Sequence, residues 1–407
     1  MNDVLELNDA SKAEVSRRRG TARWLVRTAC LAAAVAALWP VPGWPRLPVL
    51  VPSLSPLVAV ASSLAVRAIP ATAVLGLIVG AIALVRRRWF CRWVCPTGLC
   101  ADCAGRIGRR TNSRGGTRWR WSPGQWIALA TLAGAAAGYP LFAWLDPLAM
   151  FSGLFTLTGP ARWGALGVPA IVLLSLFIPG LWCSRLCPLG AMQDLLSLAA
   201  RNLAHQGRRA DDAAAAEPRG RLTRRVVLST AIGAVWAATA RALHAAGPGP
   251  LRPPGARDER SFTGLCIRCG NCARVCPAGI IAPDAGGLGL AGLLTPVVRF
   301  QEAYCLKDCT RCMDVCPSGA LRRLSVQQKL ASPIGLPRVD MNVCLLGDDH
   351  ECGVCRNECP YEAISLQFNE ADYAVVPRID SQRCSGCGAC ETACPTAPVK
   401  AIVVRPV

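Results

Sequence analysis

The sequence predicts a two-part fold, in which an α-helical membrane domain is followed by a small, cysteine-rich α+β domain. The 407-residue chain has a formal net charge of +19, of which residues 1–246 contribute +18 and residues 247–407 contribute +1. All 12 tryptophans lie at or before Trp236, whereas 16 of the 23 cysteines follow residue 247. Because 52% of the residues are hydrophobic, a disordered polyelectrolyte is excluded.

Five apolar stretches in the first part approach the ~20 residues that a membrane-spanning helix needs. Tryptophans stand near their ends, where indole rings favour the headgroup level of a bilayer. Segment 47–66 is also apolar, but three prolines interrupt it, so we expect it to lie at the outer surface without crossing. We therefore expect about five transmembrane helices, at residues 22–42, 68–85, 125–145, 164–182 and 226–246.

Arginine clusters predict the orientation of these helices. Loop 86–124 contains ten arginines and segment 183–225 contains eight, whereas the opposite loops contain only Arg46, Arg67 and Arg162. Since cytoplasmic loops are enriched in Lys and Arg, we expect a multi-pass protein of the bacterial inner membrane with a cytoplasmic N-terminus and an extracytoplasmic (periplasmic) C-terminal domain. The positive charge thus indicates membrane orientation, and no nucleic-acid partner is expected.

The membrane part contains an internal two-helix repeat. In each copy an L-x-P-L segment is followed 37 or 38 residues later by a C-x3-C-P motif. The first copy has residues 54–57 and the motif that starts at Cys91, and the second has residues 145–148 and the motif that starts at Cys183. We expect the L-x-P-L segments at the outer face and the C-x3-C-P motifs at the inner face. Two copies in the same orientation imply a pseudo-twofold axis.

Four four-cysteine motifs follow one another in the second part, and each ends in C-x3-C-P. The first and last have the C-x2-C-x2-C-x3-C-P spacing of bacterial [4Fe–4S] proteins, in which the fourth cysteine binds the neighbouring cluster of a pair. Zinc sites use separated C-x2-C pairs instead. We therefore predict bis-[4Fe–4S] ferredoxin-like domains with four clusters. Their expected ligands are Cys266, Cys269, Cys272, Cys276, Cys305, Cys309, Cys312, Cys316, Cys344, Cys352, Cys355, Cys359, Cys384, Cys387, Cys390 and Cys394.

Six further cysteines are expected at the cytoplasmic face. Repeat symmetry favours one more [4Fe–4S] cluster there, and a local site that uses Cys100 and Cys103 is the alternative. About 30 Å of hydrocarbon would separate either site from the outer clusters, so we do not expect a continuous path for electrons within the chain. The symmetric ligand set is Cys91, Cys95, Cys183 and Cys187, and the local set is Cys91, Cys95, Cys100 and Cys103.

Residues 223–228, Thr-Arg-Arg-Val-Val-Leu, precede an alanine-rich apolar stretch and resemble a twin-arginine (Tat) export signal, which serves proteins exported in the folded state. A plain fifth helix with positive flanking residues is the alternative interpretation. The expected domains are a cytoplasmic tail (1–21), a four-helix membrane domain (22–205), a linker with the twin-arginine-like segment and the fifth helix (206–260), and a four-cluster ferredoxin domain (261–407).

With these four spacings after a twin-arginine segment, residues 261–407 resemble the NapG/MauM-type periplasmic ferredoxins. Residues 20–205, with paired C-x3-C-P motifs, resemble NapH-type membrane proteins and the wider polyferredoxin group that contains NosR. The chain thus resembles a fusion of the two. The resemblance implies a quinol-oxidising relay that feeds a periplasmic reductase, and it implies that Cys91, Cys95, Cys183 and Cys187 are the inner cluster ligands.

The leading hypothesis is a membrane-anchored electron-transfer protein that uses the quinone pool. It would relay electrons from quinol through four [4Fe–4S] clusters to an extracytoplasmic oxidoreductase, such as a nitrate-reductase-type enzyme, as a quinol dehydrogenase component. The rival is a membrane maturation or regulatory factor for a metalloenzyme.

Two polar residues are interpreted as solvated: Asp146, whose alternative role is to accept a quinol proton, and His350, which lies in the x7 gap of the third motif.

Overall fold

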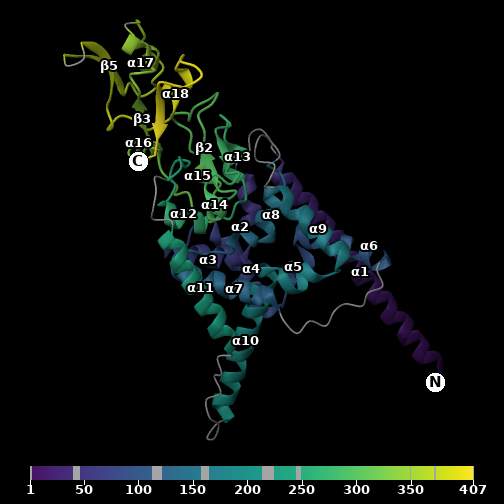
Figure 1. Ribbon diagram of the computed structural model, residues 1–407. Helices are drawn as coiled ribbons and strands as arrows, with labels where there is room; N and C mark the ends of the chain where they lie inside the picture. Colours follow the sequence, from purple (N-terminus) through teal and green to yellow (C-terminus); the bar gives the residue numbers. More distant parts are fainter. Residues whose placement is uncertain are drawn as a thin grey trace.

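The computed structural model describes residues 2–39, 46–111, 122–156, 165–212, 224–243, 249–348, 350–370 and 373–406. Figure 1 shows a helical domain and, extending from one side of it, a smaller C-terminal domain with short helices and strands. The N-terminus lies at the free end of α1, on the side of the helical domain away from the C-terminal domain (Figure 1).

The helical domain consists of long helices and short helical segments between them. The longer helices are α1 (Asn2–Leu38), α3 (Pro56–Val66), α4 (Ala73–Val85), α6 (Pro96–Thr111), α7 (Pro123–Ala136), α9 (Gly167–Phe177), α10 (Pro188–Asp212) and α11 (Arg224–Leu243). The short segments are η1 (Leu47–Val49), α2 (Leu50–Ser53), α5 (Trp89–Trp93), η2 (Ala143–Leu145), α8 (Pro147–Gly153) and the π-helical η4 (Trp182–Leu186).

Each of the five expected membrane segments contains a helix, but most of these helices are short. Among the described residues, only Gly20–Leu38 is long and apolar enough to cross a membrane by itself. Leu47–Ser53 and Pro56–Val66 would add a second span only if this pair, bent by 93°, formed one unit. The apolar helices at Ala73–Val85, Gly167–Phe177 and Val227–Thr239 are shorter. Five full-length spans are therefore not supported.

The proline-interrupted segment 47–66 packs within the helical domain, and its expected position at the outer surface of the membrane stays a prediction. Helix α3 packs against α4 and α7, and most of its side chains are buried. The close fit depends on Gly76 of α4, because a Cβ atom there would lie 2.5 Å from the Ser55 carbonyl oxygen and 2.6 Å from the Ala59 Cβ. Small residues allow helices to approach closely in this way.

The two repeat copies interlock in a reciprocal manner. Helix α4 of the first copy packs against α10 of the second, and α9 of the second packs against α6 of the first. At the centre, the Ser55 hydroxyl donates a hydrogen bond of 2.5 Å to the Asp146 carboxylate. These two residues occupy equivalent places in the repeat, so this contact marks the pseudo-twofold relation between the copies.

Asp146 is fully buried, which corrects its interpretation as a solvated residue. Its carboxylate caps the N-terminus of α8 by accepting hydrogen bonds from the backbone N–H groups of Leu148 and Ala149. Ser55 caps α3 in the same way, through the N–H of Val58. The polar residue of each L-x-P-L segment therefore begins a helix, and the proline after it occupies the first helical turn, where no backbone N–H is needed.

The C-terminal domain has three two-stranded antiparallel ladders among its described residues. Strands β1 and β2 pair Ile281 with Val298, β4 and β5 pair Ile364 with Ile379, and β3 and β6 pair Val339 with Ile402. The strands are β1 (Ile281–Pro283), β2 (Pro296–Val298), β3 (Leu336–Val339), β4 (Ile364–Asn369), β5 (Ala374–Ile379) and β6 (Ile402–Arg405). The helices are α12 (Glu259–Leu265), α13 (Asn271–Val275), α14 (Gly289–Gly292), α15 (Arg311–Asp314), α16 (Val326–Leu330), η5 (Leu345–Asp348), α17 (Val354–Asn357) and α18 (Ala389–Ala393).

Residues 249–260 pack onto this C-terminal domain, which therefore begins before the expected boundary at residue 261. Buried Arg252 forms a 2.5 Å ion pair with Glu259 and donates a 2.7 Å hydrogen bond to the Pro296 carbonyl. Its guanidinium also lies 4.7 Å from the ring centre of Phe262. These contacts hold the entry of the chain against α12 and β2.

Candidate iron–sulfur sites

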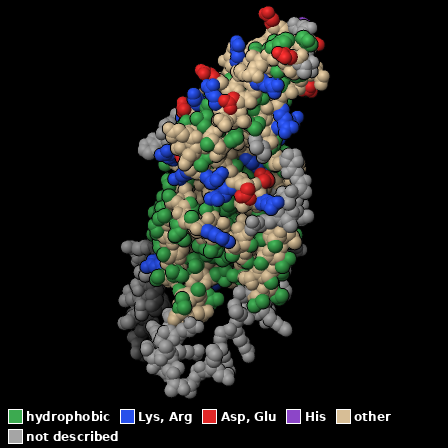
Figure 2. Space-filling model, turned by 90° about the vertical axis from the view of Figure 1, so that its left-hand side faces the viewer, with side chains coloured by type: hydrophobic (Ala, Val, Ile, Leu, Met, Phe, Trp, Pro, Cys, Tyr) green, Lys and Arg blue, Asp and Glu red, His purple; other side chains and the backbone are tan. Residues whose placement is uncertain are grey.

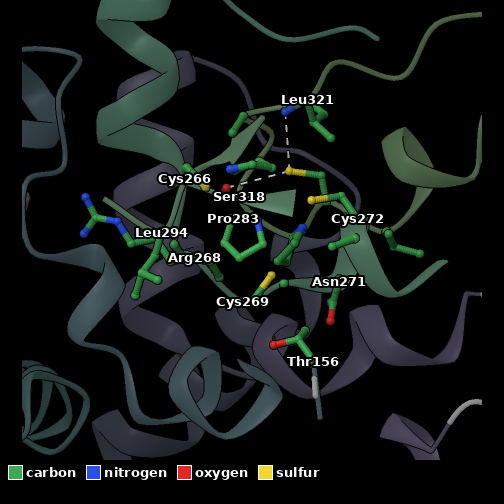
Figure 3. A pocket seen from close by; sticks show the side chains of 18 of the residues that line it. Thr156, Cys266, Arg268, Cys269, Asn271, Cys272, Pro283, Leu294, Ser318 and Leu321 are labelled. Carbon is green, nitrogen blue, oxygen red and sulfur yellow. Dashed lines mark hydrogen bonds between the residues drawn. The ribbon is translucent and has the colours of Figure 1, made fainter. Parts of the chain in front are cut away.

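The cysteines of the C-terminal domain gather into four groups, which we name sites I to IV. Site I has three cysteines from the loop into α13 and one that follows α15, and all four line a single cavity. Figure 3 shows the sulfur atoms of Cys266, Cys269 and Cys272 around it. The backbone N–H of Leu321 donates a hydrogen bond of 3.4 Å to the fourth sulfur. Site I is Cys266, Cys269, Cys272 and Cys316.

Site II contains the last cysteine of the first motif and the first three of the second. Cys312 interacts electrostatically with the other members of this group. The site II loop is held by Lys329, a residue that is 3% exposed. Its ammonium group donates hydrogen bonds of 2.6, 3.2 and 3.0 Å to the carbonyl oxygens of Leu306, Lys307 and Cys309. Site II is Cys276, Cys305, Cys309 and Cys312.

Sites III and IV repeat this arrangement with the third and fourth motifs. The longer gap of the third motif contains η5, and within it His350 Nδ1 lies 2.7 Å from the Asp348 carbonyl oxygen of its own exposed loop. In both pairs of sites the fourth cysteine of one motif joins the three cysteines of the other, which is the exchange expected from the spacing. Site III is Cys344, Cys352, Cys355 and Cys394, and site IV is Cys359, Cys384, Cys387 and Cys390.

The residues around these sulfurs fit iron–sulfur clusters. Burial raises the pKa of Cys269 and that of Cys312 to about 12, so these thiols are protonated when no metal is bound. Thiolates are required for ligation, and cluster binding would therefore release protons and stabilise the fold. Among the described residues, no three or more His, Cys, Asp or Glu residues are arranged to hold a single metal ion.

A fifth group, site V, lies in the helical domain and follows the repeat symmetry. The C-x3-C-P motifs end at the N-termini of α6 and α10, where Gly98 N–H donates to Cys95 Sγ at 3.4 Å and Gly190 N–H donates to Cys187 Sγ at 3.5 Å. Both of these cysteines interact electrostatically with the first cysteine of each motif. Site V is Cys91, Cys95, Cys183 and Cys187.

Two polar residues that the sequence reasoning did not single out support site V. The side chain of Gln193 is fully buried, and its Nε2 donates a hydrogen bond of 3.1 Å to Cys91 Sγ. Arg88 donates to the Cys183 carbonyl at 3.3 Å and forms a 2.6 Å ion pair with buried Asp194. N–H donors and a fixed positive charge beside thiolates suit the negative charge of a cysteine-ligated cluster. The sequence marks Arg88 and Gln193 as candidates only by their positions, three residues before Cys91 and six residues after Cys187.

The local alternative is not the arrangement found. Cys100 and Cys103 lie on α6, and the electrostatic partners of Cys100 are Cys103 and Arg27. Arg27 of α1 is buried and forms a 2.7 Å ion pair with Asp102, which lies on α6 between these two cysteines. The structure thus brings together the symmetric set of four, while the proposal that these cysteines are ligands stays a prediction.

Site V lies close to the C-terminal domain, which corrects the expectation that a full hydrocarbon thickness separates them. The Thr97 hydroxyl, two residues after Cys95, donates a hydrogen bond of 2.9 Å to the Pro147 carbonyl at the start of α8. Near the end of α8, the Ser152 hydroxyl donates one of 2.7 Å to Asn271, next to Cys272 of site I. The L-x-P-L segments and the C-x3-C-P motifs therefore meet inside the domain instead of occupying opposite faces.

Comparison with known proteins finds family models that match segments of both parts. A family model described as a 4Fe-4S dicluster domain matches residues 265–320 and 350–397, and one described as a 4Fe-4S binding domain matches residues 68–114 and 161–204. The methylamine utilization ferredoxin-type protein MauM of Methylobacillus flagellatus is 35% identical over 184 residues, which cover 42% of this chain and 76% of MauM. The chain belongs to the MauM/NapG family of ferredoxin-type proteins.

Other members of the family are similar over a shorter stretch of the chain. The ferredoxin-type protein NapG of Escherichia coli is 37% identical over 155 residues, which cover 35% of this chain and 65% of NapG. For NapG of Haemophilus influenzae the identity is 36%, over 36% of this chain and 55% of that protein. No solved structure matches the chain. The prediction of [4Fe–4S] ferredoxin-type domains is confirmed, and this MauM/NapG-type chain is an iron–sulfur electron-transfer protein.

Proposed function

We propose that this chain is a membrane-anchored relay that takes electrons from quinol and passes them through its ferredoxin domain to an extracytoplasmic oxidoreductase. When bound, [4Fe–4S] clusters supply one-electron acceptors and donors, whose potentials depend on burial and on hydrogen bonds to sulfur. The observation that carries the proposal is the arrangement of the cysteine groups in an unbroken series.

Contacts between neighbouring sites define that series. Cys272 of site I interacts electrostatically with Cys312 of site II. The backbone N–H of Cys305 in site II donates a hydrogen bond of 2.9 Å to the carbonyl of Cys387 in site IV. Cys390 of site IV in turn interacts with Cys355 of site III. The spatial order is therefore I, II, IV, III, and site III is the exit that we propose for the partner protein.

Apolar side chains on the outside of the helical domain support membrane anchoring. Figure 2 shows hydrophobic side chains gathered over the helical part of the molecule, whereas charged side chains are more frequent over the C-terminal domain. Contiguous exposed apolar surface of this extent marks an interface with a membrane or another protein. Large exposed side chains occur on α1, α4, α9 and α11, including Leu25, Val26, Ile78, Val85, Leu173, Phe177, Val235 and Trp236.

We further propose that residues 1–246 form a NapH-type anchor in the inner membrane, with a cytoplasmic N-terminus and a periplasmic ferredoxin domain. The arginine distribution, the twin-arginine-like residues 223–228 and the match of two segments to a 4Fe-4S binding domain support this assignment. Residue 223 lies outside the described residues. In this assignment site V holds a fifth cluster.

Rapid mixing of the purified, cluster-loaded chain with a reduced quinol analogue tests the relay. We expect bleaching of the cluster absorbance, and reoxidation when a periplasmic molybdenum reductase is added. Clusters that stay oxidised would contradict the quinol donor and favour a maturation factor.

Thiol labelling of a single cysteine placed near residue 407 in intact cells tests the topology, since only an extracytoplasmic C-terminus reacts with an impermeant reagent.

A further inference from the structure

We infer that helix α8 is a direct bridge for electrons between site V and site I, so that the helical domain and the ferredoxin domain need no mobile carrier between them. The inference rests on the proposed function, because it assumes that sites V and I both bind clusters. It goes beyond that function by naming the segment that connects the two sites.

Side chains of α8 belong to buried clusters that include cysteines of both sites. Leu148 and Phe151 belong to the same buried cluster as Cys95 and Cys187 of site V. Ala149 belongs to the buried cluster that contains Cys269 of site I. Helix α8 therefore connects the surroundings of the two sites, and its seven residues span about 10 Å along the helix axis. Electron tunnelling decays exponentially with distance, and a separation of this size favours direct transfer.

Hydrogen bonds fix both ends of the bridge. At the site V end, buried Thr97 donates to the Pro147 carbonyl at 2.9 Å, which links α6, two residues after Cys95, to the first residue of α8. At the site I end, Arg274 Nη2 donates to the Ser152 carbonyl at 2.5 Å, and the Ser152 hydroxyl donates to Asn271 at 2.7 Å. A path of covalent bonds and hydrogen bonds thus runs between the sites.

At Gly270 the loop of site I is packed too closely against the helical domain to accommodate a side chain. A Cβ atom on Gly270, between two site I residues, would lie 2.2 Å from Thr156 Cγ2. Asn271 is 1% exposed and also donates to the Pro48 carbonyl at 3.0 Å. Figure 3 shows Thr156 and Asn271 beside the site I cavity. The site I loop and the helical domain are therefore in direct contact at these residues.

The proposed step moves one electron from site V to site I and neither forms nor breaks a covalent bond. Thr97 acts as a positioning residue, because its hydroxyl joins the site V segment to α8 without contacting a sulfur in the described structure. Removal of the Thr97 hydroxyl should replace its hydrogen bond to the Pro147 carbonyl by a longer gap in the electron path. The positions of the cysteines should not change.

Magnetic coupling between reduced clusters gives the first test, on the full chain in detergent. We expect the electron paramagnetic resonance signal of site I to be broadened by a spin at site V. The double variant Cys91→Ser/Cys183→Ser should contain about four fewer iron atoms per chain and show a narrowed site I signal. An unchanged iron content would contradict site V as a cluster site, which is the proposed function. Lost iron with an unaltered site I signal would overturn the bridge alone.

The second test measures electron transfer with the bridge perturbed. In Thr97→Val the side chain keeps its shape, so iron content should equal that of the wild type, while reduction of site I through site V should become several-fold slower. Thr131→Val is the matched control, since this buried hydroxyl donates to the Ile127 carbonyl within α7, away from the path. Equal rates in Thr97→Val, Thr131→Val and the wild type would overturn the assignment of Thr97 to the path.

Discussion

The buried pair of Ser55 and Asp146 shows how one residue position organises the helical domain. Each residue caps a short helix, and the two side chains share a hydrogen bond where the repeat copies meet. An aspartate beside a proline in an L-x-P-L segment is equally compatible with a solvated turn. The partner hydroxyl of Asp146 comes from Ser55 of the first repeat copy, so this buried contact forms only when the two copies pack together.

Lys329 has a comparable role in the ferredoxin domain, because its buried ammonium group holds three carbonyl oxygens of the site II loop. We expect Lys329→Met to release that loop and to lower the free energy of unfolding by about 2–3 kcal/mol, since buried acceptors are left without donors. Iron analysis and urea unfolding followed by cluster absorbance measure this effect.

Lys307→Met is the matched control for Lys329→Met. Lys307 is exposed and donates only a 3.4 Å hydrogen bond to the Pro360 carbonyl, besides lying over the Tyr361 ring. This variant should keep both its iron and its unfolding midpoint. Equal behaviour of the two variants would contradict the role of Lys329 in holding site II.

At the scale of elements, close helix packing depends on glycines at particular places. On α6, a Cβ atom at Gly108 would lie 2.0 Å from the Leu176 carbonyl oxygen of α9, whereas one at Gly105 would lie 3.5 Å from the nearest atom, in ordinary contact. The α6–α9 packing is one of the two reciprocal contacts between the repeat copies. Glycine 108 therefore sets how closely the copies approach.

A pair of alanine substitutions tests this packing. Gly108→Ala should force α6 and α9 apart and lower the melting temperature, because a backbone oxygen cannot move out of the way. Gly105→Ala should be neutral or stabilise the protein by about 0.5–1 kcal/mol, since alanine favours a helix over glycine. Thermal unfolding in detergent distinguishes the two, and a destabilised Gly105→Ala with an unaffected Gly108→Ala would contradict the packing.

At the scale of the whole molecule, the ferredoxin domain is docked on the helical domain through site I and not through a free linker. Gly264 meets the ring of Tyr139, where a Cβ atom would lie 2.7 Å from the ring, and the Arg268 guanidinium lies 4.9 Å from the ring centre of Trp144. Asn271 adds two buried hydrogen bonds. Site III lies at the opposite end of the series of cysteine groups from this interface.

Removal of the Asn271 side chain should weaken this docking. We expect Asn271→Ala to cost about 1–3 kcal/mol in domain association, because the Ser152 hydroxyl loses its acceptor in a buried interface. Hydrogen exchange of the α8 backbone should increase, with no loss of iron. Arg46→Ala is the control, since its 3.0 Å ion pair with Asp314 joins the same domains at an exposed position. Equal exchange in both variants would contradict the docking at Asn271.

The sequence by itself determined the ferredoxin domain, the grouping of its sixteen cysteines and the internal repeat, because ligand spacing and periodic motifs are local properties of the chain. It also indicated the symmetric cysteine set. Only the tertiary structure decided that segment 47–66 is buried, that Asp146 is a cap, and that α8 is hydrogen-bonded to segments of both site V and site I. Hydropathy and charge report which segments avoid water, but they do not report whether a short apolar helix crosses a bilayer or packs within a protein, since both environments exclude water equally.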